Sequence, residues 1–522
     1  MLLLKTLLRD PNALTASSKV FSKNVTFDKK CMNLAIKIGN RTMNSNARQY
    51  SMSPLLRSGA KKQSSILKQA NATCLTKTLL SQRRQFSSFK PLFNEGSASA
   101  GKSDVTPDMV NSVKTSNSVA YWLIGTSGLV FGIVVLGGLT RLTESGLSIT
   151  EWKPVTGSLP PIGQKEWEEE FLKYQSSPEF QQLNSHINLD EFKFIFFMEW
   201  IHRLWGRAIG VVFIAPAIYF AVTKRSSPHV NKRLLGLTSL LGLQGFLGWW
   251  MVKSGLDQEQ LDARKSKPTV SQYRLTTHLG AAFFLYMGML WTGLDILKEN
   301  KWMKNPDQAA KLFQKLDSPA LGPMRKIALT LLAFCFVTAM SGGMVAGLDA
   351  GMIYNTWPKM GNSWFPSGRE LMDSNFARRE DKKDMWWRNL LENPTTVQLV
   401  HRTFATAAFF GVFAVHMYAI KKKLALPRNA QMSVHALMGV VTLQVTLGIF
   451  TILLVVPTPL ASTHQAGSLA LVTAAVVFAN QVRRPRANVR TLINSGFAQQ
   501  LLKKTANSGS KIMTEASKLA SK

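Results

Sequence analysis

Eight long apolar stretches constrain what this chain can fold into more than any other feature of its sequence. A hydrocarbon core of about 30 Å is crossed by roughly 20 mostly apolar residues in an α-helix, and each stretch is about that long or longer. Segments of this kind must be helical, because lipid offers no partner for free backbone N–H and C=O groups. The sequence therefore predicts an all-α membrane protein with eight transmembrane helices. We expect the spans at residues 118–140, 194–222, 233–253, 274–297, 326–348, 397–420, 431–456 and 459–481.

The net charge of the chain, +33, is concentrated toward its N-terminus. The first 90 residues hold 17 Lys or Arg but only two acids, Asp10 and Asp28, and they are rich in Ser, Thr, Asn and Leu. This composition is typical of a mitochondrial import presequence, with a disordered basic tail as the alternative. Nucleic acid is not predicted as a partner, because no basic region is interleaved with aromatic residues in a compact fold.

Two short motifs resemble processing signals, RQYS ending at Ser51 and RQFS ending at Ser87. The second is favoured because it lies closer to the first span, so we predict a presequence at about residues 1–86 and a matrix segment at 87–117. Cys335 is then the one cysteine of the mature chain, which excludes an intramolecular disulfide and a cysteine-based metal site. Since it lies in an apolar stretch, we expect it to be a packing residue.

The charges of the connecting segments predict the orientation of the spans. The loops after the second and sixth spans contain basic residues and no acid, and the chain after the eighth span is also basic. The loop from Arg141 to Glu191 instead holds nine acids and four bases. By the positive-inside rule, both termini lie in the matrix and the long loops lie in the intermembrane space. Spans two, four, six and eight then begin at the outer face of the membrane.

The chain also repeats itself. GGLTRLTESGLSITEW, from Gly137, aligns without gaps on GGMVAGLDAGMIYNTW, from Gly342, and EWIHRLW and TTH in the first half recur as QLVHRTF and STH in the second. Ordered matches across four spans predict two duplicated four-helix bundles. The predicted divisions are an N-terminal half at 118–297, a matrix linker at 298–325, a C-terminal half at 326–481 and a matrix tail at 482–522.

Four of the eight histidines obey this duplication. His202 corresponds to His401 and His278 to His464, and each lies near the outer end of an even-numbered span. Two histidines at matched depth in each half are what bis-imidazole ligation of one haem per bundle would require. Purely structural histidines remain an alternative, and zinc is disfavoured because neither half offers the further ligands that such a site needs. His416 and His435 lie toward the matrix and have no repeat partner, so packing or surface roles are expected for them.

Other residues near these histidines would suit a flat macrocycle. Glycines crowd the first and third spans, among them Gly137 and Gly248, and would let a porphyrin or a second helix approach closely. Arg203 and Arg402 each follow a histidine and could pair with haem propionates. Extension of these arginines to the membrane surface is the alternative.

The two halves differ at one position beside the predicted ligands. Glu199 lies three residues before His202, on the same helix face, and its repeat equivalent is Gln398. A buried carboxylate can accept a proton or stabilise developing positive charge. We therefore predict chemistry at Glu199, with a structural hydrogen bond as the alternative.

These motifs resemble the haem A synthase family, in its mitochondrial and proteobacterial type without a loop cysteine pair. The resemblance covers roughly residues 118–481. Its most specific segments are GGLTRLTESGLSITEWKPVTGSLPP, FMEWIHRLWGR, TTHLGAAFF, GGMVAGLDAGMIYNTWP, QLVHRTFA and STHQAG.

The resemblance implies oxidation of the C8 methyl group of haem O to a formyl group by two successive hydroxylations, an oxidoreductase reaction on a CH group. It implies that His202 and His278 ligate the substrate haem with Glu199 beside the reacting methyl, and that His401 and His464 hold a haem B. It also implies electron supply by ferredoxin and its reductase.

The sequence thus predicts a multi-pass enzyme of the mitochondrial inner membrane that makes haem A for cytochrome c oxidase, surrounded by lipid. Haem O synthase is an expected partner, and a homo-oligomer is left open. The alternative function is a bis-histidine b-type cytochrome that only transfers electrons. A transporter also suits duplicated bundles, but transporters usually place broken helices at mid-membrane, whereas the polar residues here gather near the outer face.

Overall fold

The computed structural model describes residues 113–153, 157, 159–264, 267–421 and 426–496. The predicted presequence, most of the matrix segment that follows it, and residues 497–522 of the predicted tail lie outside these ranges. Helices account for most of the described residues, and no β-strand occurs among them. The all-α prediction is confirmed.

All eight predicted spans are helices long and apolar enough to cross a membrane. They are α6 (Asn117–Leu142), α8 (Leu189–Val222), α9 (Pro228–Leu256), α11 (Gln272–Lys304), α13 (Leu321–Gly347), α16 (Pro394–Lys421), α17 (Arg428–Leu453) and α18 (Thr458–Val482). Shorter helices occupy the connections: α7 (Gln164–Gln175), α10 (Gln258–Arg264), α12 (Pro306–Asp317), α14 (Gly368–Leu371), α15 (Met385–Glu392) and α19 (Ala487–Asn494). Three single turns complete the described helices: η3 (Phe180–Asn184), η4 (Ala350–Met352) and η5 (Ser374–Phe376).

Several helix ends differ from the predicted bounds. Helix α8 begins five residues early because Asn188 caps it, accepting hydrogen bonds from the backbone of Asp190 and Glu191 while the Glu191 carboxylate accepts one from the Asn188 N–H. Helix α17 ends three residues early, since Val455 and Val456 have φ angles of +61° and +55° that a helix cannot continue.

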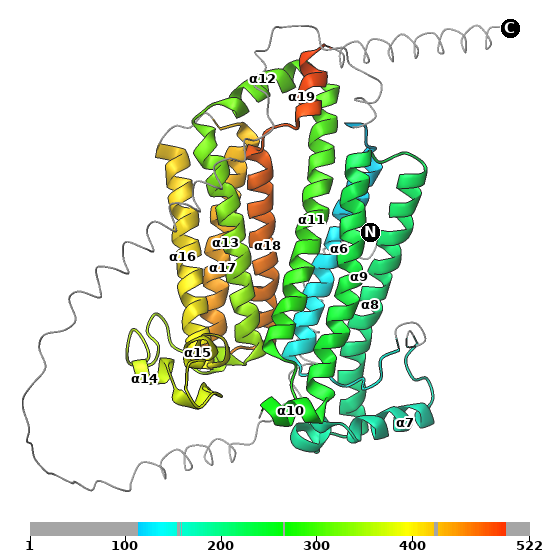
Figure 1. The fold of residues 1–522 in the computed structure, drawn as a ribbon, viewed down its shortest axis with the longest axis vertical. Coiled ribbons are helices and arrows are strands. Elements are labelled where there is room, and N and C mark those ends of the chain that lie inside the picture. The colour runs from blue at the N-terminus through cyan, green and yellow to red at the C-terminus, as the bar shows by residue number, and fades with distance from the viewer. Residues whose placement is uncertain (1–112, 154–156, 158, 265–266, 422–425, 497–522) are drawn as a thin grey trace, which may run out of the picture. The chain divides into compact units, whose positions relative to one another are not determined.

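The two sets of four helices share one pattern of neighbours (Figure 1). In the first set, α6 and α9 each contact both α8 and α11; in the second, α13 and α17 each contact both α16 and α18. The sets meet through contacts of α11 with α13, α6 with α18, and α11 with α18. The first and fourth helices of each set therefore make the contacts between the two sets.

A cluster of buried charges joins the sets at the end where α11 finishes. Asp295 of α11 binds Arg233 of α9 at 3.0 Å and Arg483, which follows α18, at 2.8 Å. One turn later, Glu299 pairs with Arg486. Helix α11 continues seven residues beyond its predicted end. The arginines compensate the charges of Asp295 and Glu299, so these acids can be buried within the helix. The predicted linker is itself helical over α12, which packs against α19.

Candidate functional site

The four repeat-related histidines occupy corresponding places in the two sets. His202 lies on α8, His278 on α11, His401 on α16 and His464 on α18. Each imidazole is partly accessible and packs against a glycine of a neighbouring helix. The facing glycines are Gly137 of α6, Gly248 of α9, Gly342 of α13 and Gly448 of α17.

These glycines make room for the imidazoles. A Cβ atom at Gly137 would lie 2.8 Å from Cε1 of His202, and one at Gly448 would lie 2.8 Å from Cε1 of His464. Such distances are too short for carbon atoms in van der Waals contact. A side chain at either position would therefore push the imidazole away. Gly137 was expected to allow close approach of a porphyrin or a second helix, and the group that approaches it is the imidazole of His202, a predicted ligand.

The geometry of the second pair can be compared directly with haem ligation. The ring centroids of His401 and His464 are 6.5 Å apart, with an angle of 82° between the ring planes. Bonds from a metal to imidazole nitrogen are about 2 Å long, so rings on opposite sides of one metal ion have centroids about 6 Å apart. The separation of His401 and His464 therefore fits two axial ligands of one haem iron.

Polar atoms of the histidines also point to a bound group. The Nδ1 atoms of His202, His278 and His464 are buried and have no hydrogen-bond partner within the described ranges. Only the Nδ1 atom of His401 has one, the Ser341 hydroxyl at 2.8 Å. Buried polar atoms are nearly always paired, so these sites need partners that the protein does not supply.

The four histidines do not belong to larger clusters of metal-binding side chains. In the part of the chain that the structure describes, no group of three or more His, Cys, Asp or Glu side chains could hold a metal ion. Zinc sites use three or four protein ligands. A haem iron needs only two axial ligands from protein, which is what each set of helices provides.

Glu199 is buried on α8, with 3% of its surface exposed. Its Oε2 accepts hydrogen bonds from the Ser148 hydroxyl at 2.7 Å and the Ile149 N–H at 2.8 Å, and its Oε1 pairs with Arg203 at 2.6 Å. The carboxylate is thus held between its own helix and the loop that follows α6. This loop was not recognised in the sequence as part of the site.

Gln398 takes the equivalent place on α16, but it donates hydrogen bonds to the loop backbone where Glu199 accepts one. Its Nε2 donates to the carbonyls of Ala350 at 2.8 Å and Tyr354 at 3.2 Å. Arg402 donates to the Tyr354 carbonyl at 2.8 Å and to that of Thr356 at 2.9 Å. Tyr354 aligns with Ile149 in the sequence repeat, so the two sets fix equivalent segments of the loops that follow α6 and α13.

The two arginines are engaged by these loops. Arg203 donates to the carbonyls of Ile149 at 3.1 Å and Glu151 at 3.2 Å, and its guanidinium lies 5.3 Å from the ring centre of Trp152. Arg402 lies 6.0 Å from the ring centre of Trp357. Both side chains therefore organise the loop above their histidine, and propionate binding by either remains a prediction.

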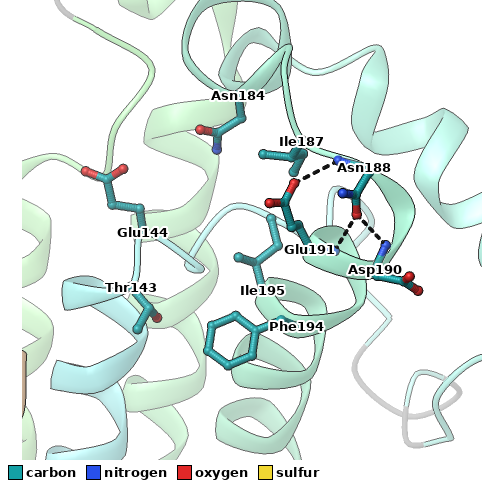
Figure 2. A pocket seen from close by; sticks show the side chains of 9 residues that line it. All are labelled: Thr143, Glu144, Asn184, Ile187, Asn188, Asp190, Glu191, Phe194 and Ile195. Atoms are coloured by element: carbon teal, nitrogen blue, oxygen red, sulfur yellow. Dashed lines mark hydrogen bonds between the residues drawn. The ribbon is translucent and has the colours of Figure 1, made fainter. Parts of the chain in front are cut away.

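A cavity of about 540 Å³ opens beside the first site, between the end of α6 and the start of α8. Figure 2 shows Glu144 on one side of it, the capping residues Asn188 and Glu191 on the other, and Asn184 above. Its lining combines carboxylates and amides with the apolar Phe194 and Ile195. The cavity therefore suits water and small polar molecules.

A second buried carboxylate, Glu179, was not recognised in the sequence, and hydrogen bonds through Tyr174 connect it to the cavity residue Asn184. Glu179 is 5% exposed and accepts a hydrogen bond from the Tyr174 hydroxyl at 3.0 Å. Burial raises the pKa of Glu179 to about 8, and the charges of Glu199 and Glu144 act in the same direction. Only the folding of the loop brings these acids together.

His416 and His435 were expected to have separate packing or surface roles. The structure brings them together on α16 and α17, with His416 Nε2 2.9 Å from His435 Nδ1. His435 is exposed on the surface of its helix. Neither faces the two predicted haem pairs, so both serve below as controls.

The family of the chain's relatives is well defined. The family model of cytochrome oxidase assembly proteins, COX15–CtaA, matches residues 120–476. A haem A synthase COX15 from Saccharomyces cerevisiae is 72% identical over 439 residues, which cover 84% of this chain and 88% of that protein. The human haem A synthase COX15 is 44% identical over 366 residues, covering 70% of this chain and 83% of that protein.

One relative joins two proteins in a single chain. A haem A synthase–mitochondrial ferredoxin fusion protein from Schizosaccharomyces pombe is 49% identical over 382 residues. The match covers 72% of this chain and 62% of the fusion protein.

Proposed function

The chain belongs to the COX15–CtaA family of cytochrome oxidase assembly proteins, and we propose from this premise that it makes haem A from haem O. It is a membrane enzyme of haem A synthesis. The observation that carries the proposal is that each set of helices holds two histidines that face a glycine, and that the rings of His401 and His464 are 6.5 Å apart. An electron-transfer cytochrome is not favoured, since the relatives described above are haem A synthases.

We assign the first set of helices to the substrate. His202 and His278 would bind haem O, and the glycines opposite them leave space for their imidazoles. The reaction would convert the C8 methyl group to a formyl group through two hydroxylations, which makes the protein an oxidoreductase. A bound haem supplies one-electron redox chemistry at its iron.

Glu199 is the residue of the first set that can handle protons. It stands one helical turn from His202, toward the outer end of α8. Arg203, Ser148 and the Ile149 N–H fix the carboxylate, so it does not have to reorganise when charge develops nearby. We propose that it accepts a proton released during oxidation of the methyl group.

The second set would hold haem B between His401 and His464. The 6.5 Å separation of their rings leaves room for one iron that both imidazoles would bind, and Gln398 offers no ionisable group in place of Glu199. This site therefore suits electron relay better than proton chemistry. The ferredoxin joined to the fission-yeast relative supports ferredoxin as the electron donor.

We place the enzyme in the mitochondrial inner membrane with both termini in the matrix. The eight helices support a multi-pass protein, and the mitochondrial ferredoxin joined to the fission-yeast relative supports a mitochondrial location. The basic loops and the acidic first outer loop support the orientation.

Haem extraction from purified protein tests the proposal. Protein made in cells that lack their own haem A synthase should contain haem B together with haem O or haem A, identified by mass. His401→Ala and His464→Ala should lose haem B, and His202→Ala and His278→Ala should lose the substrate haem.

His416→Ala and His435→Ala are the matched controls and should leave the spectrum nearly unchanged. Protein that carries only haem B and restores no haem A would instead establish the electron-transfer alternative. Loss of the haem spectrum in the two control variants, with the other four unaffected, would overturn the ligand assignment.

A further inference from the structure

The third helix of each set contacts the histidine of the fourth helix through two residues. In α9, Gln244 and Gly248 lie four residues apart and so share one helix face. The Gln244 amide donates to the His278 carbonyl at 3.2 Å, and Gly248 faces the ring of the same histidine. Helix α9 therefore holds both the backbone and the imidazole of His278.

Helix α17 repeats this arrangement around His464. Gln444 donates to the His464 carbonyl at 2.9 Å, and Gly448 faces the imidazole. A carbonyl inside a helix already accepts from the N–H four residues later, so the glutamine amide binds its second lone pair. Because the backbone does not need this extra hydrogen bond, its recurrence at both histidines indicates that it positions them.

The two arrangements differ in how closely they hold the histidine. A Cβ atom at Gly448 would lie 2.8 Å from Cε1 of His464, whereas one at Gly248 would lie 3.5 Å from Cε1 of His278. The first distance is too short for two carbon atoms, and the second is an ordinary van der Waals contact. The amide hydrogen bond is also longer at His278 than at His464, 3.2 Å against 2.9 Å.

The histidines of the second helices show no such difference. A Cβ atom at Gly137 would lie 2.8 Å from Cε1 of His202, and one at Gly342 would lie 3.0 Å from Cε1 of His401. His278 is therefore the least closely packed of the four against its facing glycine.

One residue of the fourth helix accounts for this difference. Gly467 lies three residues after His464, and a Cβ atom there would collide with Oε1 of Gln444. The glycine thus lets the Gln444 amide settle against α18. The corresponding residue of α11 is Ala281, whose methyl group keeps Gln244 farther from the helix backbone.

We propose that His278 is the exchangeable ligand, which releases the haem iron so that substrate can enter and product can leave, while His464 stays bound. The proposal rests on the two haem sites of the proposed function. A product must leave after each reaction and a resident cofactor must stay, so the two sets need ligands held with different firmness. In the release step the bond from iron to imidazole nitrogen breaks, and its electron pair remains on the nitrogen. Gln244 and Gln444 are positioning residues, because they act through the histidines.

Carbon monoxide measures this release without any turnover. It binds a ferrous haem that has two histidine ligands only after one of them leaves. Purified protein that contains both haems, reduced with dithionite, should bind carbon monoxide in two phases. Ala281→Gly should slow the faster phase by about tenfold, the lower end of the effects of contacts behind a metal ligand, and leave the slower phase unchanged. Ala282→Gly on the same helix is the control, because it has the same cost in helix propensity.

Gln444→Leu makes the converse change in the second set. The slower phase should become about tenfold faster, because His464 loses its backbone hydrogen bond, and the faster phase should keep its rate. Gly467→Ala should act in the same direction, since its new Cβ would displace the Gln444 amide. Gln431→Leu, at an exposed position of α17, is the matched control.

An Ala281→Gly protein whose faster phase keeps its rate would overturn the proposal. Acceleration of the faster phase by Gln444→Leu would also overturn it, because the loosely held ligand would then belong to the second set. Two bound haems that take up carbon monoxide at one rate would refute the exchangeable ligand alone. Extraction that finds no haem in the first set would instead refute the proposed function, so the two failures are distinguishable.

Discussion

Glu199 and Gln398 show how one residue distinguishes two otherwise similar sites. Both are buried, and both bind the same segment of an outer loop. Glu199 accepts from a backbone N–H, whereas Gln398 donates to backbone carbonyls. The loop beside Glu199 presents a backbone donor, and the loop beside Gln398 presents backbone acceptors. A substitution at either position therefore changes hydrogen bonding as well as charge.

Glu199→Gln tests proton chemistry with little change of volume. The amide oxygen can still accept from Ser148 and Ile149, but the ion pair with Arg203 is lost. We expect haem B binding to persist while haem O or a hydroxylated intermediate accumulates, with haem A formation lowered about 10²–10⁴-fold. Extracted haems should be compared at equal protein abundance. Normal haem A formation would reduce Glu199 to a structural residue.

The reciprocal change, Gln398→Glu, provides the control. A carboxylate there would face the carbonyl oxygens of Ala350 and Tyr354, so a lower yield of folded protein is expected. Haem A formation per folded molecule should nevertheless stay largely intact, because the second site has no proton-transfer role.

Gly137→Ala tests whether the glycines serve the histidines. Replacing a helical glycine with alanine ordinarily stabilises a helix by about 0.5–1 kcal/mol. At Gly137 the new Cβ would lie 2.8 Å from His202, so displacement of the imidazole and loss of the haem of the first half are expected. Gly128→Ala on the same helix is the control, since nothing lies within 4 Å of its Cβ position. The haem absorption spectra of the two purified variants should be compared. Equal spectra would show that Gly137 is not needed to position His202.

At the scale of elements, α11 and the chain after α18 depend on buried ion pairs. Glu299 and Arg486 are 5% and 22% exposed at their side chains, whereas Asp317 and Arg490 are 38% and 36% exposed. Removing one partner of a buried pair leaves the other charge uncompensated. The end of the protein where α11 finishes is therefore expected to loosen more when the Glu299–Arg486 pair is broken.

Arg486→Ala should lower the free energy of unfolding by up to about 3–5 kcal/mol, because buried Glu299 would keep only its longer contact with Arg483, at 3.4 Å. Arg490→Ala, which breaks the more exposed pair, should cost about 0–1 kcal/mol. Thermal unfolding in detergent measures the difference, and the haem spectrum of folded protein should not change. Equal losses in the two variants would contradict the role of burial.

The helices themselves could be predicted from apolar length, but their ends could not. Asn188 and Glu191 start α8 early through side-chain contacts that hydrophobicity does not register. Asp295 and Glu299 resemble the polar end of a span in the sequence, yet they are buried in α11 because arginines far along the chain neutralise them. The apolar pattern of the sequence therefore predicts the spans. The ends of α8 and α11 depend on side-chain hydrogen bonds and ion pairs that this pattern does not contain.

At the scale of the whole molecule, the duplication made the histidines predictable. His202, His278, His401 and His464 stood out because their spacing recurs, and the structure places each against a glycine. Contacts that depend on how the outer loops fold had no such signal. Ser148, which donates to Glu199, and Glu179, which accepts from Tyr174, both lie between α6 and α8. No periodic pattern in the sequence indicates how this loop folds.

The orientation of the whole molecule is the last prediction, and it decides which compartment the four histidines face. Cys335 is buried, so it gives a low background for thiol labelling after removal of the presequence. Cysteines introduced at the exposed positions Ser185 and Lys383 should react with an impermeant reagent added outside mitoplasts. The predicted orientation places the loops that contain these two positions outside the inner membrane. A cysteine at exposed Lys232, near the start of α9, should react only after the inner membrane is opened. Protection of Ser185→Cys together with labelling of Lys232→Cys would invert the protein and place the histidines, Glu199 and the cavity on the matrix side.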